Sequence, residues 1–262
     1  FVQMDAAGIN FAKVGTKSQP STTGDGSVID LGGTDTITTT NGDKVILGGD
    51  GADSITAENG NHIVFGDNGQ ITYVAMGAVG AGLPLLYETT DTLQETGGND
   101  IITLCGDNVV FGGMGDDEIT TCAGIDTIFG DNGLVQMSAN GANFAQITST
   151  QVNAIGNDII TTLDGPKVII AGAGNDVVNT GTGPHIITGD NGSLTYAPTG
   201  IIARVTTIAP TVGGNDTVTV AGGDTVILGG FGNDNVVTGA GNDVLLGDTG
   251  FVSFNVLGRL LK

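Results

Sequence analysis

Short glycine-rich units that recur every nine residues constrain this chain more than any other feature. Residues 32–67 consist of four such units in a row, GGTDTITTT, NGDKVILGG, DGADSITAE and NGNHIVFGD. Once the glycine turns are set aside, each unit has room only for a strand of a few residues, which is too short for a helix. A short fixed period of this kind predicts a coil of stacked strands in which each unit packs on its neighbours.

The nine-residue units are grouped into longer blocks. GDNG occurs at 66–69, 130–133 and 189–192, and GDTG follows at 247–250. These positions divide the chain into blocks 1–69, 70–133, 134–192 and 193–250, and residues 251–262 begin like a further block. We predict one continuous solenoid. We also expect the chain to be an excerpt, or a processed piece, of a longer array.

The charge balance indicates that the folded chain binds something positive. Acidic residues outnumber basic ones 28 to 7, so the net charge is −21, yet 39% of the residues are hydrophobic. That apolar content exceeds what is typical of disordered chains, and an unneutralised compact form would repel itself. Metal cations or basic partners fit this balance, whereas nucleic acid and anionic membranes do not.

Other features of the sequence narrow the class of protein. There is no apolar run long enough to span a membrane, and the first ten residues lack the pattern of a signal peptide. Two cysteines are too few for a disulfide scaffold. Cys105 and Cys122 lie at equivalent places on successive turns, where either a disulfide or a pair of buried thiols is expected.

One unit in each block carries an extended motif. Residues 48–56, 112–120 and 229–237 fit GGxGxDxUx, where U is a large apolar residue, and 171–179 departs only at the first glycine. The chain resembles the RTX calcium-binding nonapeptide-repeat family, whose motif this is. The resemblance covers the second part of every block. It implies calcium bound between turns, folding driven by calcium, and export through a type I secretion channel.

Physical reasoning from the residues leads to the same ion. Glycine-rich turns reach backbone conformations closed to other residues, and can point carbonyl oxygens inward. Two units make one turn of the coil, so residues 18 apart stack at one strand spacing; Asp35 then lies beside Asp53, and Asp158 beside Asp176. Stacked carboxylates repel unless a cation separates them. A set of carboxylate and carbonyl oxygens suits Ca²⁺ better than Zn²⁺.

The predicted fold class is all-β, a right-handed parallel β-roll or β-solenoid with regularly inserted β-hairpins. Two gaps between turns in each block would hold roughly eight Ca²⁺ ions. The predicted ligands are Asp35, Asp53, Asp67, Asp100, Asp117, Asp131, Asp158, Asp176, Asp190, Asp216, Asp234 and Asp248, with Asp126 and Asp243 as ligands of a weaker ion.

The opposite stack carries Lys44 and His62 in block one, and Lys167 and His185 in block three. A zinc site is one interpretation of the histidines. The other, which we favour, is that lysine supplies built-in positive charge where calcium is absent.

The two sides of the predicted coil differ in their outward residues. Beside the aspartates these are mostly threonines, such as Thr56, Thr103 and Thr161, which predicts a solvated face. On the other side they are apolar, which predicts a covered face. The first part of each block reads as a hairpin, folded back on that face or paired into a second sheet. A second copy of the chain, building a fibre or lattice, is the alternative cover.

No catalytic constellation is evident, because the repeats account for the histidines and aspartates. We expect a non-enzymatic structural module of a large exported bacterial protein, at the cell surface or outside the cell, such as an adhesin stalk, surface layer or filament. The alternatives are an accessory module of a secreted enzyme and an ice- or glycan-binding module. Calcium is the expected partner, and further copies of the chain are the expected partners if it builds a fibre or lattice; neither nucleic acid binding nor membrane insertion is expected.

Overall fold

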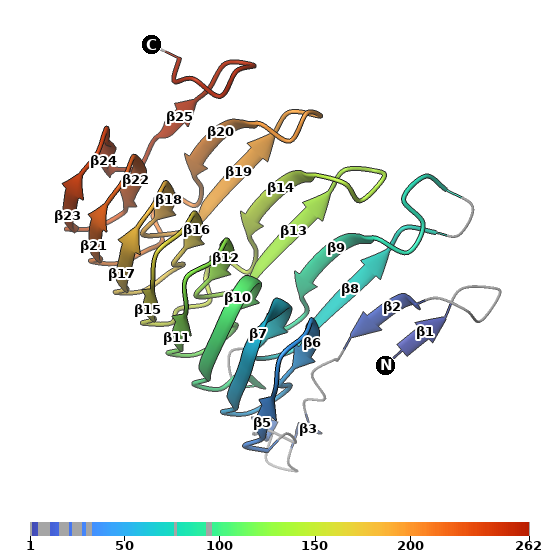
Figure 1. Ribbon diagram of the computed structural model, residues 1–262. Coiled ribbons are helices and arrows are strands. Elements are labelled where there is room, and N and C mark those ends of the chain that lie inside the picture. Colours follow the sequence, from blue (N-terminus) through green and yellow to red (C-terminus); the bar gives the residue numbers. More distant parts are fainter. Residues whose placement is uncertain are drawn as a thin grey trace.

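The protein is all-β and consists of a coiled parallel sheet joined to a long antiparallel sheet (Figure 1). The structure is a computed structural model that describes residues 2–4, 11–15, 21–22, 28–29, 33–75, 78–92 and 96–261. The mostly parallel coiled sheet and the antiparallel sheet confirm the predicted fold class, a β-roll with antiparallel insertions. Within the described ranges no helix has the length and apolar character needed to cross a membrane.

The parallel sheet forms a solenoid whose turns each contribute one strand, or half of a long strand, to two columns. The first column contains β5 (Thr36–Thr39), the first halves of β7 (Ser54–Phe65) and β10 (Ile101–Phe111), β11 (Glu118–Thr121), β15 (Ile159–Thr162), β17 (Val177–Thr182), β21 (Thr217–Gly222) and β23 (Asn235–Ala240). The second column contains β6 (Lys44–Leu47), the second halves of β7 and β10, β12 (Asp126–Phe129), β16 (Lys167–Ile170), β18 (His185–Thr188), β22 (Thr225–Gly230) and β24 (Val244–Asp248).

The register of these strands follows the predicted spacing. Thr36 pairs with Ser54, which is 18 residues further along the chain. The same register continues across the inserted hairpins, because Thr56 pairs with Thr103 and Thr120 with Thr161. The insertions therefore leave the stacking of the turns unbroken. The coil interior is filled by inward apolar residues, among them Ile55, Ile102, Ile119, Ile160, Val178 and Val218.

The inserted hairpins pair side by side into the antiparallel sheet. Its strands are β1 (Val2–Met4), β2 (Phe11–Gly15), β8 (Gly69–Tyr73), β9 (Pro84–Thr89), β13 (Gly133–Met137), β14 (Phe144–Ser149), β19 (Gly192–Tyr196), β20 (Ile202–Thr207) and β25 (Phe251–Ser253). A separate two-stranded pair joins β3 (Ser21–Thr22) and β4 (Val28–Ile29). Of the two hairpin arrangements predicted from sequence, pairing into a second sheet is the one observed.

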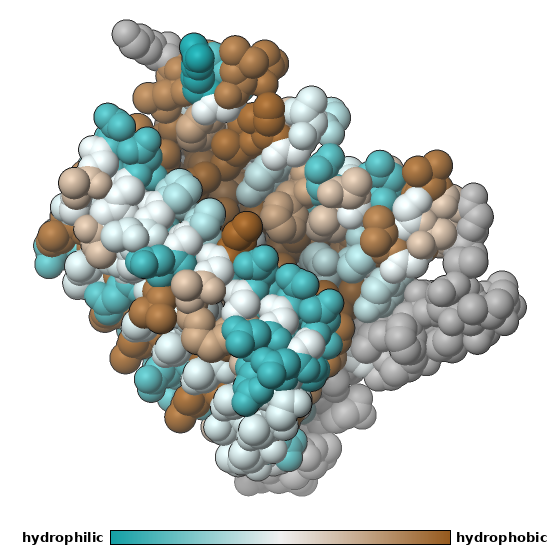
Figure 2. Space-filling view, in the orientation of Figure 1, coloured by the Kyte–Doolittle hydropathy of each residue, from teal (hydrophilic) through white to brown (hydrophobic). Residues whose placement is uncertain are grey.

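A second hydrophobic core joins the antiparallel sheet to the second column. Phe65, Phe111 and Phe129 stack along the column with ring centroids 4.7 and 4.8 Å apart, and pack with buried residues of the other sheet such as Ile71 and Val135. Figure 2 shows further apolar surface, in brown, in the hollow between the two halves of the molecule. Because the chain's own hairpins bury much of the apolar face, covering it does not require another copy.

The remaining outer surface agrees with the pattern of the repeats. Thr56, Thr103 and Thr219 on the first column are exposed to solvent.

Cys105 and Cys122 form a disulfide with their Cα atoms 4.6 Å apart. The structure thus contains the disulfide, one of the two alternatives that the sequence left open.

Candidate metal centre

One aspartate stands before each first-column strand, and together they form a continuous line that we call the aspartate ladder. Its members are Asp35, Asp53, Asp100, Asp117, Asp158, Asp176, Asp216 and Asp234. From Asp53 onward, the Oδ1 atom of each accepts a hydrogen bond from the backbone N–H of the ladder residue one turn before it; the Asp100 N–H, for example, donates to Asp117 Oδ1 at 2.8 Å. The other distances, from Asp35–Asp53 to Asp216–Asp234, lie between 2.7 and 3.0 Å.

The second carboxylate oxygen in the ladder is left over for another partner. Most of the ladder is buried, since Asp100, Asp158 and Asp176 are each 1% exposed, whereas Asp35 on the first turn is exposed. The Oδ2 atom lacks a hydrogen bond in Asp100, Asp117, Asp158, Asp176, Asp216 and Asp234. A buried charged oxygen with no partner costs several kcal/mol. A proton or a cation is therefore required at each of these oxygens.

Glycines in the turns bring a backbone carbonyl next to the Oδ2 atom of each of these aspartates except Asp176, at whose turn Ala171 takes the place of the glycine. At Gly112 the space that a Cβ would need is already taken by the Gly130 carbonyl oxygen and the Asp117 Oδ2. The same convergence of carbonyl and ladder carboxylate recurs at Gly48, Gly66, Gly130, Gly189 and Gly229. Paired carboxylate and carbonyl oxygens in a repeated frame fit the preference of Ca²⁺ for many oxygen ligands.

The fit of these donors to a cation does not depend on a cluster of side chains. Within the described ranges no three side chains of His, Cys, Asp or Glu converge as a metal site. A calcium site can instead be completed by backbone carbonyls and water. In this chain the ladder Oδ2 atoms and the glycine-turn carbonyls would be the ligands.

Replacing Gly112 with alanine should destabilise the calcium-bound protein by about 1–3 kcal/mol, because the new methyl group overlaps both oxygens at that turn. Gly247 has the same place in its unit but has open space around it, so Gly247→Ala is the matched control. Urea unfolding in calcium measures both. Equal losses in the two variants would contradict the role given to the Gly112 turn.

The aspartates of the GDNG segments are placed close to the ladder and bind backbone N–H groups. Asp67 accepts hydrogen bonds from Met114 (2.6 Å) and Gly98 (3.1 Å). Asp131 accepts one from Ala173 (2.6 Å), and Asp190 accepts from Gly214 (2.9 Å) and Phe231. All three aspartates are buried, whereas Asp248 on the last turn is exposed. Their role as ligands stays a prediction.

Burial and mutual repulsion raise the pKa of several buried aspartates, both in the ladder and in the GDNG segments. Burial raises the pKa of Asp100 and of Asp216 from 3.8 to about 8, with a further contribution from neighbouring ladder carboxylates. Burial, followed by the charge of Asp158, also raises the pKa of Asp117 and of Asp131 well above the usual value. Without a cation, the fold therefore favours the protonated form of these four carboxyl groups.

Stability of the calcium-free protein should fall as pH rises from about 4 to about 8. The raised pKa of Asp100 and Asp216 means that the folded state holds protons which the unfolded chain releases above pH 3.8. This contribution is complete below the unfolded pKa and is lost as pH passes the folded one. Thermal melts in chelator across this range measure the trend, and saturating calcium should abolish it. A calcium-free melting temperature that rises with pH would contradict the prediction.

The second column contains a buried lysine, Lys167, whereas the first column contains ladder Oδ2 atoms without hydrogen bonds. Lys167 is 2% exposed, and its Nζ donates to Asp126 Oδ2 at 2.8 Å. It is the only ion pair among the residues that the structure describes. Asp126, predicted from sequence as a ligand of a weaker ion, is thus already paired with an ammonium group. This placement supports the interpretation of lysine as built-in positive charge.

The other anchors of the second column also bind within the protein. Lys44 donates to the carbonyls of Asn41 (3.0 Å) and Gly42 (2.7 Å). The His185 Nε2 atom lies 3.2 Å from the Gly181 carbonyl oxygen, and His62 makes the corresponding contact with Glu58. Each histidine thus contacts a carbonyl of its own turn. Asp243 accepts hydrogen bonds from the Thr225 hydroxyl (2.8 Å) and N–H (3.1 Å).

Two features of this region were missed by the sequence analysis. The residues directly before the ladder form an outer line of side-chain hydrogen bonds, in which Asn175 donates to Asn157 and Asn215 to Asn175 at 3.1 Å. The recurrent Asn-Asp pairs were the signal for it. The second is Asp91, a buried residue whose carboxylate binds Asn68, and whose pKa is raised by burial to about 6. It lies outside the repeats, so no period marks it.

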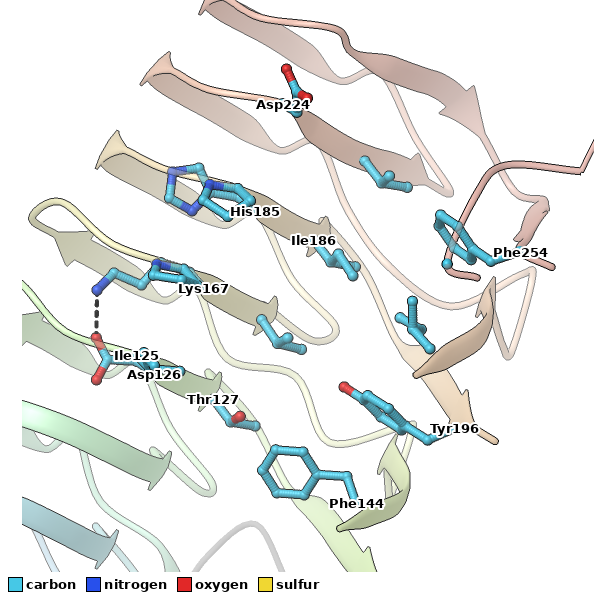
Figure 3. A pocket seen from close by; sticks show the side chains of 16 residues that line it. Ile125, Asp126, Thr127, Phe144, Lys167, His185, Ile186, Tyr196, Asp224 and Phe254 are labelled. Carbon is cyan, nitrogen blue, oxygen red and sulfur yellow. Dashed lines mark hydrogen bonds and ion pairs between the residues drawn. The ribbon is translucent and has the colours of Figure 1, made fainter. Parts of the chain in front are cut away.

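A cavity of about 500 Å³ lies between the second column and the antiparallel sheet (Figure 3). Its walls include Phe144, Tyr196 and Phe254 on one side and Ile186 on the other. Figure 3 shows the Lys167–Asp126 pair on the far side of the second-column strands from these aromatic rings. The interior of the cavity is thus mainly apolar; of its charged neighbours, Lys167 and Asp126 are paired with each other, and Asp224 accepts hydrogen bonds from Asn242.

Comparison with known proteins agrees with the geometry of the ladder. The family model described as RTX calcium-binding nonapeptide repeat (4 copies) matches residues 29–61, 39–70, 95–128, 111–134, 154–184 and 219–251, together more than half of the chain. Searches of the curated proteins and of the solved structures found no match. RTX repeats bind Ca²⁺ and are structural rather than catalytic. On this evidence the chain belongs to the RTX calcium-binding nonapeptide-repeat family.

Proposed function

We propose that this chain is a structural module of a large bacterial surface or secreted protein, in which calcium bound along the aspartate ladder makes the solenoid rigid. The observation that carries the proposal is the ladder itself, with buried Oδ2 atoms that lack hydrogen bonds over successive turns. Proteins with RTX repeats are typically exported from bacteria. An adhesin stalk, a surface layer or an extracellular filament each needs such a rigid, repetitive element.

The proposed ligands are the ladder aspartates together with Asp67, Asp131, Asp190 and Asp248 of the GDNG and GDTG segments. Asp126 is left out of this set because Lys167 is bound to it. Asp243, with its threonine donors, stays a candidate for a weaker ion. The blocks 1–69, 70–133, 134–192 and 193–250 are proposed as repeating units of one solenoid, which 251–262 would continue; parts of 1–32 and residue 262 lie outside the described residues.

The mechanism is folding coupled to calcium binding. In the low calcium of a bacterial cytoplasm the ladder carboxylates repel one another, which favours an unfolded chain that can be exported. At the millimolar calcium found outside cells, ions bind only the folded form and stabilise it by mass action. The wet threonine face and the covered apolar face are those of a spacer rather than of a catalytic domain.

Two experiments test this proposal. Small-angle scattering should give a radius of gyration near 20 Å in calcium, somewhat larger for an elongated shape, and about 55 Å in chelator at neutral pH. Antibodies raised against the chain should label intact cells of the source organism, or the culture medium. Labelling that appears only after lysis would overturn the proposed location.

The sequence of the complete gene product distinguishes this module from an accessory domain of a secreted enzyme. We expect further repeat blocks of the same kind. A protease, lipase or polysaccharide epimerase domain in the same polypeptide would favour the alternative. The regularly inserted hairpins support the structural role, because they build a second sheet along the described solenoid.

A further inference from the structure

We propose that the ammonium group of Lys167 is a tethered cation in a latent metal site of the second column, and that shortening this side chain turns the place into a calcium site. The proposal rests on the proposed function in one respect, since it takes carboxylate and turn-carbonyl oxygens as calcium donors in this fold. It goes further by assigning a metal-free clamp to the column that the ladder does not occupy.

The contacts of Lys167 are those of a caged ion rather than of a simple ion pair. Its Nζ atom lies 2.7 Å from the Gly124 carbonyl oxygen, 2.8 Å from Asp126 Oδ2 and 3.3 Å from the Asp164 carbonyl oxygen. A lysine ammonium has three N–H donors, and three oxygens surround it here. One carboxylate and two carbonyls are also the kind of ligand set that binds Ca²⁺.

The site around the Lys167 ammonium group excludes solvent, and Asp126 is at its centre. The side chains of Lys167 and Asp126 are both fully buried. The other oxygen of the same carboxylate, Oδ1, accepts from the Asn108 side chain at 2.8 Å, and the Thr121 hydroxyl donates to Oδ2 at 2.8 Å. Asn108 and Thr121 are neutral donors, and among the described residues Lys167 is the only one that forms an ion pair with Asp126. Figure 3 shows this pair bridging two neighbouring strands of the column.

Lys44 provides the matched comparison inside the chain. It has the same register in block one and also donates to two turn carbonyls, those of Asn41 and Gly42. Its hydrogen bonds are exposed, and it has no salt bridge to a carboxylate in the part of the chain that the structure describes. Removing Lys44 therefore leaves no carboxylate site behind, whereas removing Lys167 leaves a buried carboxylate oxygen and two carbonyls.

The test compares Lys167→Ala, Lys167→Met, Lys44→Ala and the double variant Lys167→Ala with Asp126→Asn. Bound calcium is counted by equilibrium dialysis and atomic emission in millimolar calcium, and thermal stability is measured over a calcium titration. We expect Lys167→Ala to bind one ion more than the wild type, and to need higher calcium to fold. Lys44→Ala and the double variant should bind the wild-type number.

Lys167→Met distinguishes calcium binding at the site from a general packing effect, because the methionine side chain fills the volume of the lysine without carrying a charge. Calcium should restore the stability of Lys167→Ala but not that of Lys167→Met. An unchanged ion count in Lys167→Ala, an equal gain in Lys44→Ala, or failure of Lys167→Ala to fold at any calcium concentration would each overturn the inference. A wild type that binds no calcium would instead overturn the proposed function, so the two failures are distinguishable.

Discussion

Removing calcium at about pH 8 is expected to unfold this chain. Eleven aspartates are buried among the described residues, and Lys167 is the only buried lysine. At that pH most of the ladder would be charged in an unfolded chain, because the usual carboxyl pKa is 3.8. Each ion held at one hundred times its Kd contributes about 2.7 kcal/mol, so the loss of several ions exceeds the stability of an ordinary domain.

Circular dichroism during a titration with chelator measures this effect. The strand signal should disappear cooperatively and return when calcium is added. Magnesium at the same concentration should restore little, since it demands a smaller octahedral site and gives up its water reluctantly. A strand signal that is indifferent to the chelator at this pH would contradict calcium-coupled folding.

The second large effect is expected from Asp117→Asn, and its sign should depend on calcium. The asparagine keeps the Oδ1 acceptor for the Asp100 N–H but removes the charge at Oδ2. In calcium the variant should lose about 3–5 kcal/mol, as when one partner of a buried ion pair is removed. In chelator it should be more stable than the wild type, because one buried charge is gone from a site where burial and Asp158 raise the pKa.

Glu118→Gln is the control for this substitution. Glu118 is the next residue, carries the same charge, and is exposed on the outer face of β11. Its replacement should change stability by less than about 0.5 kcal/mol in either condition. Denaturant unfolding of the three proteins, with and without calcium, gives the comparison. A loss for Asp117→Asn that is the same in calcium and in chelator would mean that its carboxylate has a packing role only.

Much of the fold follows from the period of the sequence. The spacing of 18 residues between Asp35 and Asp53 is the spacing of stacked turns, because each turn must return the chain to the same column. The apolar outward residues of the second column required a cover, and the hairpins between the repeats provide it. The choice between one sheet and folded-back hairpins depended on contacts between hairpins 40 or more residues apart, such as Thr148 with Ser193, which no local pattern reveals.

Contacts within the candidate site were harder to predict from the sequence where the two contacting residues belong to different turns. Asp126 stands at an anchor position like many others, and Lys167, 41 residues away, is beside it only after a hairpin has been inserted between them. Asp91 has no counterpart in the period, and blocks three and four have Gln151 and Ala209 at the corresponding place after the return strand. The outer asparagine line could have been found, since Asn157, Asn175 and Asn215 each precede a ladder aspartate.

Crystallography of the calcium-loaded protein with long-wavelength anomalous scattering tests the central claim most directly. We predict anomalous peaks between successive turns along the first column, each within about 2.3–2.6 Å of a ladder Oδ2 and of glycine-turn carbonyl oxygens. At the second column no peak should appear beside Asp126. A folded coil with no anomalous density next to Asp117, Asp158 and Asp176 would contradict the account.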